Sequence, residues 1–259
     1  MTLVGVPPPP GARRTPLPRA VLAHTRMELV LLLRSGESLL VTLGIPLGVL
    51  VFFSLVDILP TRDSPAVEFL VPGVLAISVM STGLVSLGIA TAFERKYGVL
   101  KLLGGSPLPR WALLAGKSLA VVVVVMAQTV LILVVAVWGL GWEAGGGAVP
   151  ALVGLAVGAF SFSAIGLLLA GTLRAEATLA VANTLFLALL LVSGLAFDLD
   201  VLPAPVAALS RGLPSGALGQ ALRAALDADG GSVGGPLLVV AAWGLAATAV
   251  AARRFRWEP

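Results

Sequence analysis

Three sets of residues in this chain have types and spacing that could support chemistry. Gly116-Lys117-Ser118 ends like a phosphate-binding loop, but such a loop needs a glycine where this chain has Trp111. Without that glycine the backbone amides cannot wrap a phosphate, so we expect no nucleotide site here. Asp198 and Asp200 are paired carboxylates, yet this spacing is more typical of the solvated end of a helix. His24 is the only histidine and there is no cysteine, so we predict no metal site, no cofactor and no catalytic residue.

Polar residues are also scattered through otherwise apolar segments, and Gln128 and Asn183 are the most prominent. Side chains of this kind usually form hydrogen bonds between membrane helices. The alternative is that Gln128 and Asn183 line a substrate path. Ion-coupled carriers usually place ionisable residues within their spans, and here Asp57 is the only weak candidate. The sequence therefore favours a lipophilic or amphipathic substrate, such as a drug, a lipid or a polyketide-like molecule.

Long apolar segments must position these residues. The chain is 58% hydrophobic and 12% charged, with a mean hydropathy of +1.03. About 20 helical residues cross the hydrocarbon core of a bilayer. We therefore predict an all-α membrane protein with six transmembrane helices. The predicted spans are Ser38–Leu59, Phe69–Ala92, Ser118–Leu140, Ala148–Gly171, Ala177–Ala196 and Pro236–Ala252.

Basic residues are distributed unevenly between the loops. The predicted topology places 14 of the 17 lysines and arginines on one side of the membrane. Because basic loops stay in the cytoplasm, both termini are expected there. The bias toward Ala, Gly, Val and Arg is typical of a GC-rich bacterial genome, which indicates a bacterial cytoplasmic membrane.

Two segments precede the first span. Residues 1–16 contain four consecutive prolines and are predicted to be a flexible tail. Residues 17–36 are predicted to form an amphipathic helix in the membrane interface, with Arg19, Arg26 and Arg34 away from the apolar face. The alternative is a basic lead-in to the first span. The predicted apolar face comprises Val21, Leu22, Thr25, Leu29, Leu32 and Leu33.

The cytoplasmic loop 93–117 carries the clearest functional signal. A short amphipathic helix is expected, with Val99, Leu100 and Leu103 opposite Glu94 and Lys101. Gly104-Gly105 should end it, and Ser106-Pro107 should start the helix that enters the third span. A helix, a break and a second helix can act as a lever between two spans. The simpler alternative is a solvated turn.

This loop is similar to the corresponding loop of the ABC-2 type transporter permeases, which include the daunorubicin-resistance-like exporters. Lys96 and Lys101 depart from the family pattern, where many members carry acids. The matching residues are Glu94, Arg95, Gly98, Leu100, Leu102, Leu103, Ser106, Pro107, Leu108, Arg110, Trp111, Gly116 and Lys117.

The resemblance implies the permease subunit of an ATP-driven exporter, in which two six-span subunits, identical or related, form the pathway. A separate cytoplasmic ATPase would bind ATP and Mg²⁺, so the permease itself is not an enzyme. Arg174 and Glu176 on the other inward loop would form a second contact with the ATPase. The external segment 197–235 would form short helices that dip toward the membrane. The residues that would couple the permease to the ATPase are Glu94, Arg95, Tyr97, Gly98, Leu100, Leu103, Pro107 and Arg110.

Two other functions remain open at this point. One is a secondary transporter driven by an ion gradient. The other is a membrane scaffold that recruits a cytoplasmic partner without transporting anything.

Overall fold

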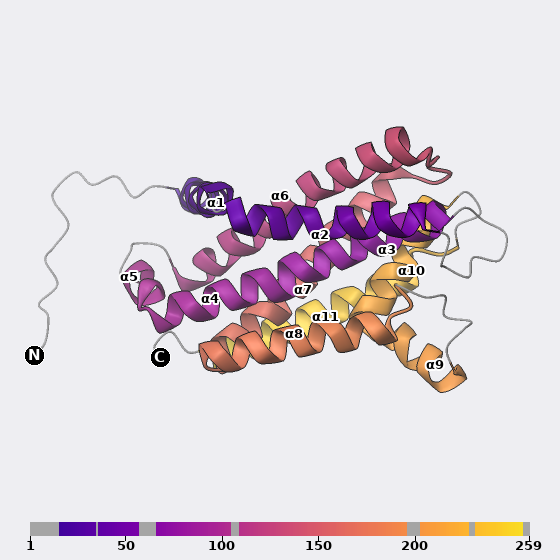
Figure 1. The fold of residues 1–259 in the computed structure, drawn as a ribbon. Helices are drawn as coiled ribbons and strands as arrows, with labels where there is room; N and C mark the ends of the chain where they lie inside the picture. Colours follow the sequence, from indigo (N-terminus) through magenta and orange to yellow (C-terminus); the bar gives the residue numbers. More distant parts are fainter. Residues whose placement is uncertain are drawn as a thin grey trace, which may run out of the picture.

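The computed structural model describes residues 16–34, 36–56, 66–104, 109–195, 203–227 and 231–255, and these residues form helices and loops with no strand among them (Figure 1). The four consecutive prolines of the tail, Asp57, Pro107 and the Asp198/Asp200 pair lie outside the described residues. The all-helical fold predicted from the apolar segments is therefore confirmed for the described part of the chain.

Five of the helices are long and apolar enough to cross a membrane. The first runs without interruption through α3 (Ala66–Met80), η1 (Ser81–Ser86) and α4 (Leu87–Lys96). The second joins α6 (Arg110–Val134) to η2 (Val135–Gly139). The other three are α7 (Ala148–Thr172), α8 (Ala175–Val192) and α11 (Gly234–Arg254).

Helix α2 (Gly36–Leu55) occupies the position of the first predicted span. Its apolar part, Thr42–Leu55, is shorter than that of the five long helices. Pro46 lies inside this helix, where it removes one backbone hydrogen-bond donor.

The centre of the bundle is α7, which packs against α11, α4, η1, α6 and α10 (Pro214–Leu226). Phe162 of α7 is fully buried. Glycines allow the backbones of α7 and η1 to touch: a Cβ atom added to Gly166 would lie 2.5 Å from the carbonyl oxygen of Gly83. A stripe of small residues of this kind lets membrane helices approach closely.

The segment between α8 and α11 is part of the helical body. It contains α9 (Ala204–Gly212) and α10. Most residues of α10 are buried, and this helix packs against α3, α7 and α11. Helix α10 begins at Pro214, because proline is well suited to the first turn of a helix. The amides of Gly146 and Gly147 donate hydrogen bonds to the carbonyl oxygens of Leu226 and Ala225, over 3.0 and 2.9 Å.

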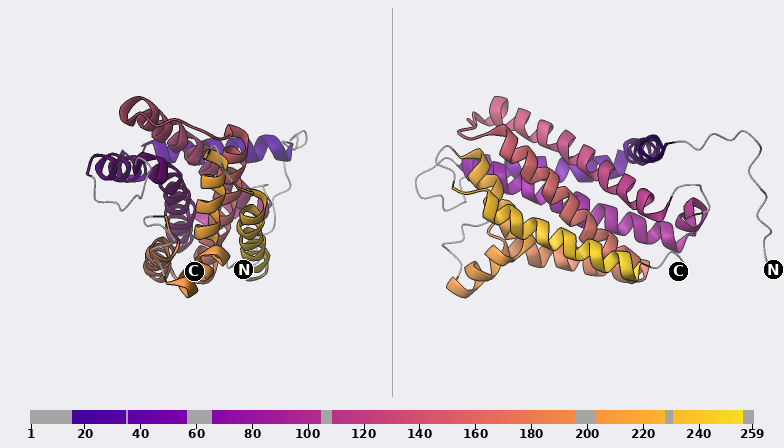
Figure 2. Two further views of the ribbon diagram at one scale, coloured as in Figure 1. Left: turned by 90° about the vertical axis from the view of Figure 1, so that its right-hand side faces the viewer. Right: turned by 180° about the vertical axis from the view of Figure 1, so that it is seen from behind.

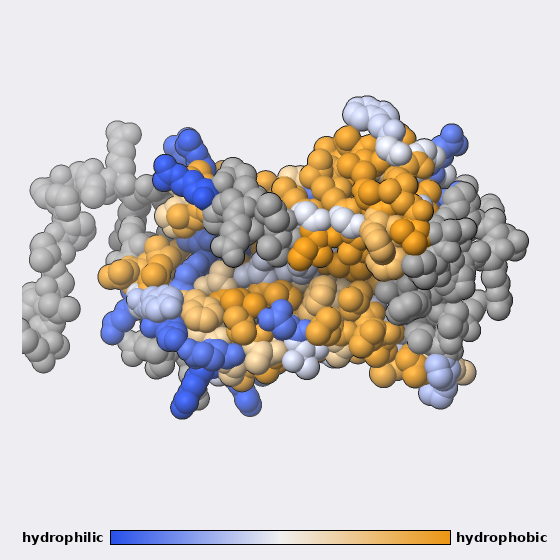
Figure 3. Space-filling model, in the orientation of Figure 1, coloured by the Kyte–Doolittle hydropathy of each residue, from blue (hydrophilic) through white to orange (hydrophobic). Residues whose placement is uncertain are grey.

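The two ends of the bundle differ. Helix α1 (Leu17–Arg34) lies across one end, nearly perpendicular to the long helices, and α5 (Val99–Gly104) and the C-terminal end of α11 lie at the same end (Figures 1 and 2). Helix α9 lies at the opposite end. In Figure 3 hydrophobic side chains cover the middle of the visible face, and hydrophilic side chains gather toward the end that carries α1 and α5.

Two π-helical turns, η1 and η2, lie within the long helices, and neither was predicted from the sequence. Turns of this type often mark functional positions in helices. The η1 turn is the more buried of the two, because Thr82, Gly83 and Leu84 face neighbouring helices.

Candidate coupling site

The helix that contains α4 extends beyond the predicted span and ends with a sharp break. Tyr97 and Gly98 form a turn, and Gly98 has a φ of 75°. This left-handed conformation is readily adopted by glycine but strained for other residues. The short helix α5 follows directly and ends at Gly104, where the sequence predicted a stop. The break at Gly98 is an additional one, and it lets α5 turn away from the axis of α4.

The next span begins at Arg110, with Pro109 in extended conformation as its N-cap. The sequence predicted a start at Ser106-Pro107, which lies outside the described residues. Arg110 itself lies in the first turn of α6, but the structure does not describe its side chain.

A buried lysine connects three elements at this end of the molecule. The side chain of Lys117 on α6 is only 1% exposed. Its Nζ atom lies 2.8 Å from Oε1 of Glu28 on α1 and 2.8 Å from Oε2 of Glu94 on α4. An isolated buried ammonium is very unfavourable, so the two carboxylates are what allow Lys117 to be charged in this position.

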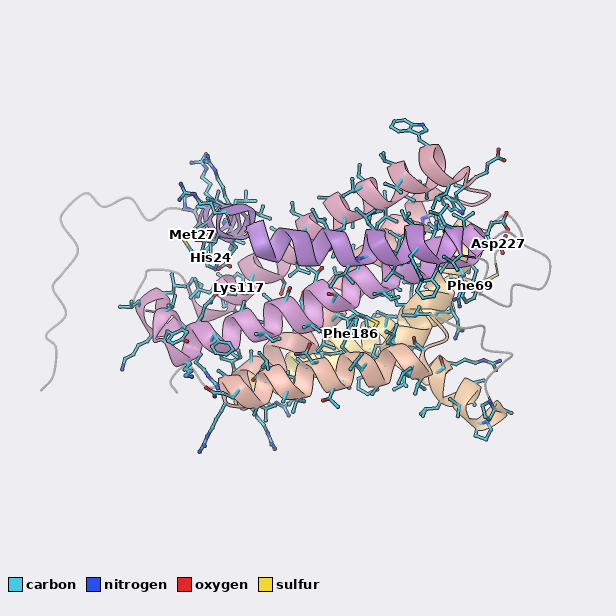
Figure 4. All side chains as sticks on the ribbon, viewed as in Figure 1. His24, Met27, Phe69, Lys117, Phe186 and Asp227 are labelled. Carbon is cyan, nitrogen blue, oxygen red and sulfur yellow. The ribbon has the colours of Figure 1, made fainter. Side chains whose placement is uncertain are left out.

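His24 completes this group, which we call the Lys117 cluster (His24, Glu28, Glu94 and Lys117). The Nε2 atom of His24 lies 3.5 Å from Oε1 of Glu28. The ring packs against the backbone of α6, where a Cβ atom added to Gly116 would lie 2.7 Å from Cδ2 of His24. Figure 4 shows His24 and Lys117 close together where α1 meets α6.

Burial lowers the pKa of His24 below its usual value of 6.5, although the carboxylate of Glu28 opposes this shift. His24 is therefore neutral near pH 7 and packs as a polar aromatic ring. Thr25 adds a neutral contact, because its hydroxyl donates a 3.1 Å hydrogen bond to the carbonyl oxygen of Gly116.

The loop between α7 and α8, which contains Arg174, is attached to the end of α4. The guanidinium of Arg95 is largely buried and donates a hydrogen bond to the carbonyl oxygen of Leu173. Lys96 forms an exposed ion pair with Glu176 at the start of α8. Lys96, which departs from the family pattern, thus has a partner within the chain. Arg174 is exposed and precedes the first turn of α8.

The structure therefore divides the predicted coupling residues into two groups. Glu94, Arg95 and Leu100 are directed into the subunit, and Leu103 is half-buried. Tyr97 is 70% exposed. That these residues couple to an ATPase remains a prediction, but Glu94 and Arg95 are placed to hold the end of α4, from which α5 continues.

Sequence reasoning missed several members of this site. Leu102 of α5 is 80% exposed, and Glu28, His24 and Lys117 belong to the Lys117 cluster. One signal was available: Lys117 is a single charge at the start of an apolar segment, and a charge in that position requires a partner. That Glu28, 89 residues away, is a partner of Lys117 could not be predicted from the sequence.

Gln128 and Asn183 have different environments. Gln128 is buried, donates a 2.8 Å hydrogen bond from Nε2 to the carbonyl oxygen of Thr42 on α2, and accepts a 3.1 Å hydrogen bond from Thr82 on η1. It therefore joins three helices. Asn183 is exposed on α8 and donates a hydrogen bond to the carbonyl oxygen of Leu179 in its own helix.

No group of three His, Asp or Glu side chains in the described part of the chain could hold a metal ion. The long apolar helices instead define a multi-pass membrane protein. A protein-family model described as "ABC-2 type transporter" matches residues 19–226, so the chain belongs to the ABC-2 type transporter family. The membrane domain of this family lacks a nucleotide-binding domain and typically pairs with ABC ATPase subunits. A search of curated proteins found no match.

Proposed function

We propose that this protein is the permease subunit of an ATP-driven exporter that moves a lipophilic or amphipathic substrate across the cytoplasmic membrane. Helix α2 would be the sixth span, and α1, α5 and both termini would lie in the cytoplasm. The observation that supports this proposal best is the attachment of α4, which leads directly into the exposed α5 segment, to α1 and α6 through the Lys117 cluster.

The cluster suggests how motion would pass from an ATPase to the spans. An ATPase that binds ATP and Mg²⁺ would contact the exposed side chains of Tyr97 and Leu102. A displacement of α5 would reach α6 and α1 through Glu94 and Lys117. It would also reach α8 through Arg95 and the Lys96–Glu176 ion pair, so Arg174 and Glu176 would move with the same unit.

The proposed substrate class rests on the composition of the spans. In the five long helices, the charged residues that the structure describes lie within a few turns of the helix ends, as Glu68, Lys117, Glu176 and Arg253 do. A pathway built from such helices would offer apolar contacts and no fixed charge near its middle. Asn183 fits a substrate path better than Gln128, because its side chain is exposed on α8 whereas Gln128 is buried between helices. The path would lie between this chain and a second permease, identical or related.

The test combines ATPase binding with substrate flux. Leu102→Glu places a charge at the proposed contact, and Leu209→Glu places the same charge on α9 at the opposite end, where Leu209 is also exposed. We expect Leu102→Glu to weaken co-purification of the ATPase at least tenfold and to abolish stimulated ATP hydrolysis, while Leu209→Glu retains both. Equal binding by the two variants would contradict the proposed contact.

Flux measurements in reconstituted vesicles separate the remaining alternatives. Export should continue when ionophores collapse all ion gradients while ATP is maintained. Flux that stops under these conditions would instead indicate an ion-driven carrier, and an assembled complex without any flux would indicate a scaffold.

A further inference from the structure

The outer face of α1 is strongly cationic. Arg19 and Arg26 are both exposed, and their seven-residue spacing places them on one side of the helix, about 20° apart. Arg34 is exposed at the end of the same helix. None of these three arginines forms an ion pair with a residue that the structure describes.

The acidic residue of α1 does not reduce this charge. Glu28 lies on the opposite, buried face, where its carboxylate contacts Lys117 and His24. The contacts that attach α1 to α6 therefore use the acidic side of the helix and leave the arginines outside. The outer face thus presents cations with no competing carboxylate among its described residues.

Apolar side chains accompany the arginines on this face. Leu22 and Val30 are exposed beside them, each about 40° from Arg26 around the helix, and Met27 is exposed at the edge of this face. Helix α1 lies nearly perpendicular to the long helices (Figures 1 and 2), so its long axis runs parallel to the membrane plane that these helices define. Exposed cations beside apolar side chains, on a helix in this orientation, match an anionic headgroup above an acyl chain.

We propose that the outer face of α1 is a binding site for anionic phospholipid headgroups, with Arg19 and Arg26 as the main contacts. The predicted interfacial position of α1 is a general property, whereas this proposal assigns a preference for lipid charge to particular residues. The site does not depend on ATP-driven transport. Its test therefore fails or succeeds independently of the proposed function.

The absence of cysteine allows a local measurement in the full-length protein. A Met27→Cys variant carrying a bimane dye would report on lipid beside Arg26. The protein would be placed in nanodiscs of phosphatidylcholine with 20% phosphatidylglycerol, in which one lipid or the other carries a shallow nitroxide quencher. The ratio of quenching by the two nitroxide lipids measures the local preference for the anionic headgroup.

We expect phosphatidylglycerol to be enriched about fivefold or more near the dye, because each basic residue beside an anionic surface contributes roughly a factor of five. Arg19→Gln with Arg26→Gln should bring the ratio close to one. The matched control, Arg253→Gln with Arg254→Gln, removes the same charge from the same end of the molecule and should keep the enrichment.

Equal quenching by the two lipids in the parent, or an equal loss in both double variants, would overturn the proposal. A parent measurement in high salt keeps the test decisive if the α1 variant does not fold, because screening should abolish a preference based on charge. A parent ratio that stays constant in high salt contradicts the proposal. Loss of ATPase binding by the α1 variant, without any lipid preference in the parent, would assign this face to the protein partner instead.

Discussion

At the scale of single residues, Lys117 is the position with the largest expected effect. Replacing Lys117 by methionine leaves Glu28 and Glu94 without the cation that compensates their burial. Removing one partner of a buried ion pair costs about 3 kcal/mol or more. We expect a clear loss of thermal stability in detergent, measured by the temperature at which the monodisperse peak disappears.

A rescue variant distinguishes lost charge compensation from lost packing. Lys117→Met combined with Glu28→Gln and Glu94→Gln removes all three charges and should recover most of the stability. The exposed Arg254 at the end of α11 serves as the control, because Arg254→Met should change little. If the triple variant is less stable than Lys117→Met alone, charge compensation is not what holds the cluster together.

His24 gives the cluster a pH dependence with a definite sign. Its pKa is lowered by burial, so between that value and the ordinary 6.5 the unfolded chain binds a proton that the folded chain does not. The stabilising contribution of neutral His24 is complete above pH 6.5 and declines as the pH falls below it. Glu28 on α1 and Lys117 on α6 are the charged groups that act on the ring, and Glu94 on α4 pairs with Lys117.

We therefore expect the parent to lose more stability than a His24→Gln variant between pH 7.5 and 5.5. Comparing the two proteins in thermal unfolding scans at each pH removes the contribution of the carboxylates, because these titrate in both proteins. Parallel curves for the two proteins would show that His24 does not titrate differently in the folded and unfolded chains.

At the scale of elements, the contact between η1 and α7 depends on glycine. A methyl group at position 166 would lie 2.5 Å from the carbonyl oxygen of Gly83 and 2.9 Å from that of Leu84, both rigid backbone atoms. Gly166→Ala should therefore destabilise the protein by about 1–3 kcal/mol, the usual cost of overpacking. Gly48→Ala on α2, where no atom lies within 4 Å of the added Cβ, should be neutral in the same unfolding measurement.

The elements were predictable to different degrees. Apolar length located the membrane helices well, because crossing a bilayer requires a run of about 20 apolar residues whatever the rest of the fold is. Which side of each helix faces a neighbour was not predictable, because a membrane helix is apolar on every side and its periodicity carries little information. The orientation of Arg95 and the burial of Lys117 depend on contacts with Leu173 and Glu28, far away in the chain.

Some local sequence signals predicted the right kind of feature at the wrong residue. The glycine-based stop after α4 was expected only at Gly104-Gly105, yet Gly98 already breaks the helix with a positive φ. The face of α1 that packs on α6 includes His24 and Glu28, and the amphipathic pattern of the sequence did not indicate that these two side chains face a neighbouring helix. Burial of a charged pair cannot be recognised from one helix when its partner lies on another.

At the scale of the whole molecule, the two ends of the bundle predict its orientation in the membrane. The described basic residues gather at the end that carries α1 and α5, whereas Arg211 and Arg223 are the described ones near α9 and α10. Basic segments stay on the cytoplasmic side. Helix α5 should therefore face the cytoplasm and α9 the outside.

Single cysteines test this orientation directly, because the chain has none of its own. Leu102→Cys and Leu209→Cys place exposed thiols at opposite ends of the molecule. In intact cells a membrane-impermeant maleimide should label Leu209→Cys, and Leu102→Cys should react only after permeabilisation. Labelling of Leu102→Cys from outside would place α5 beyond the reach of any cytoplasmic ATPase, and the proposed coupling would then fail together with the orientation.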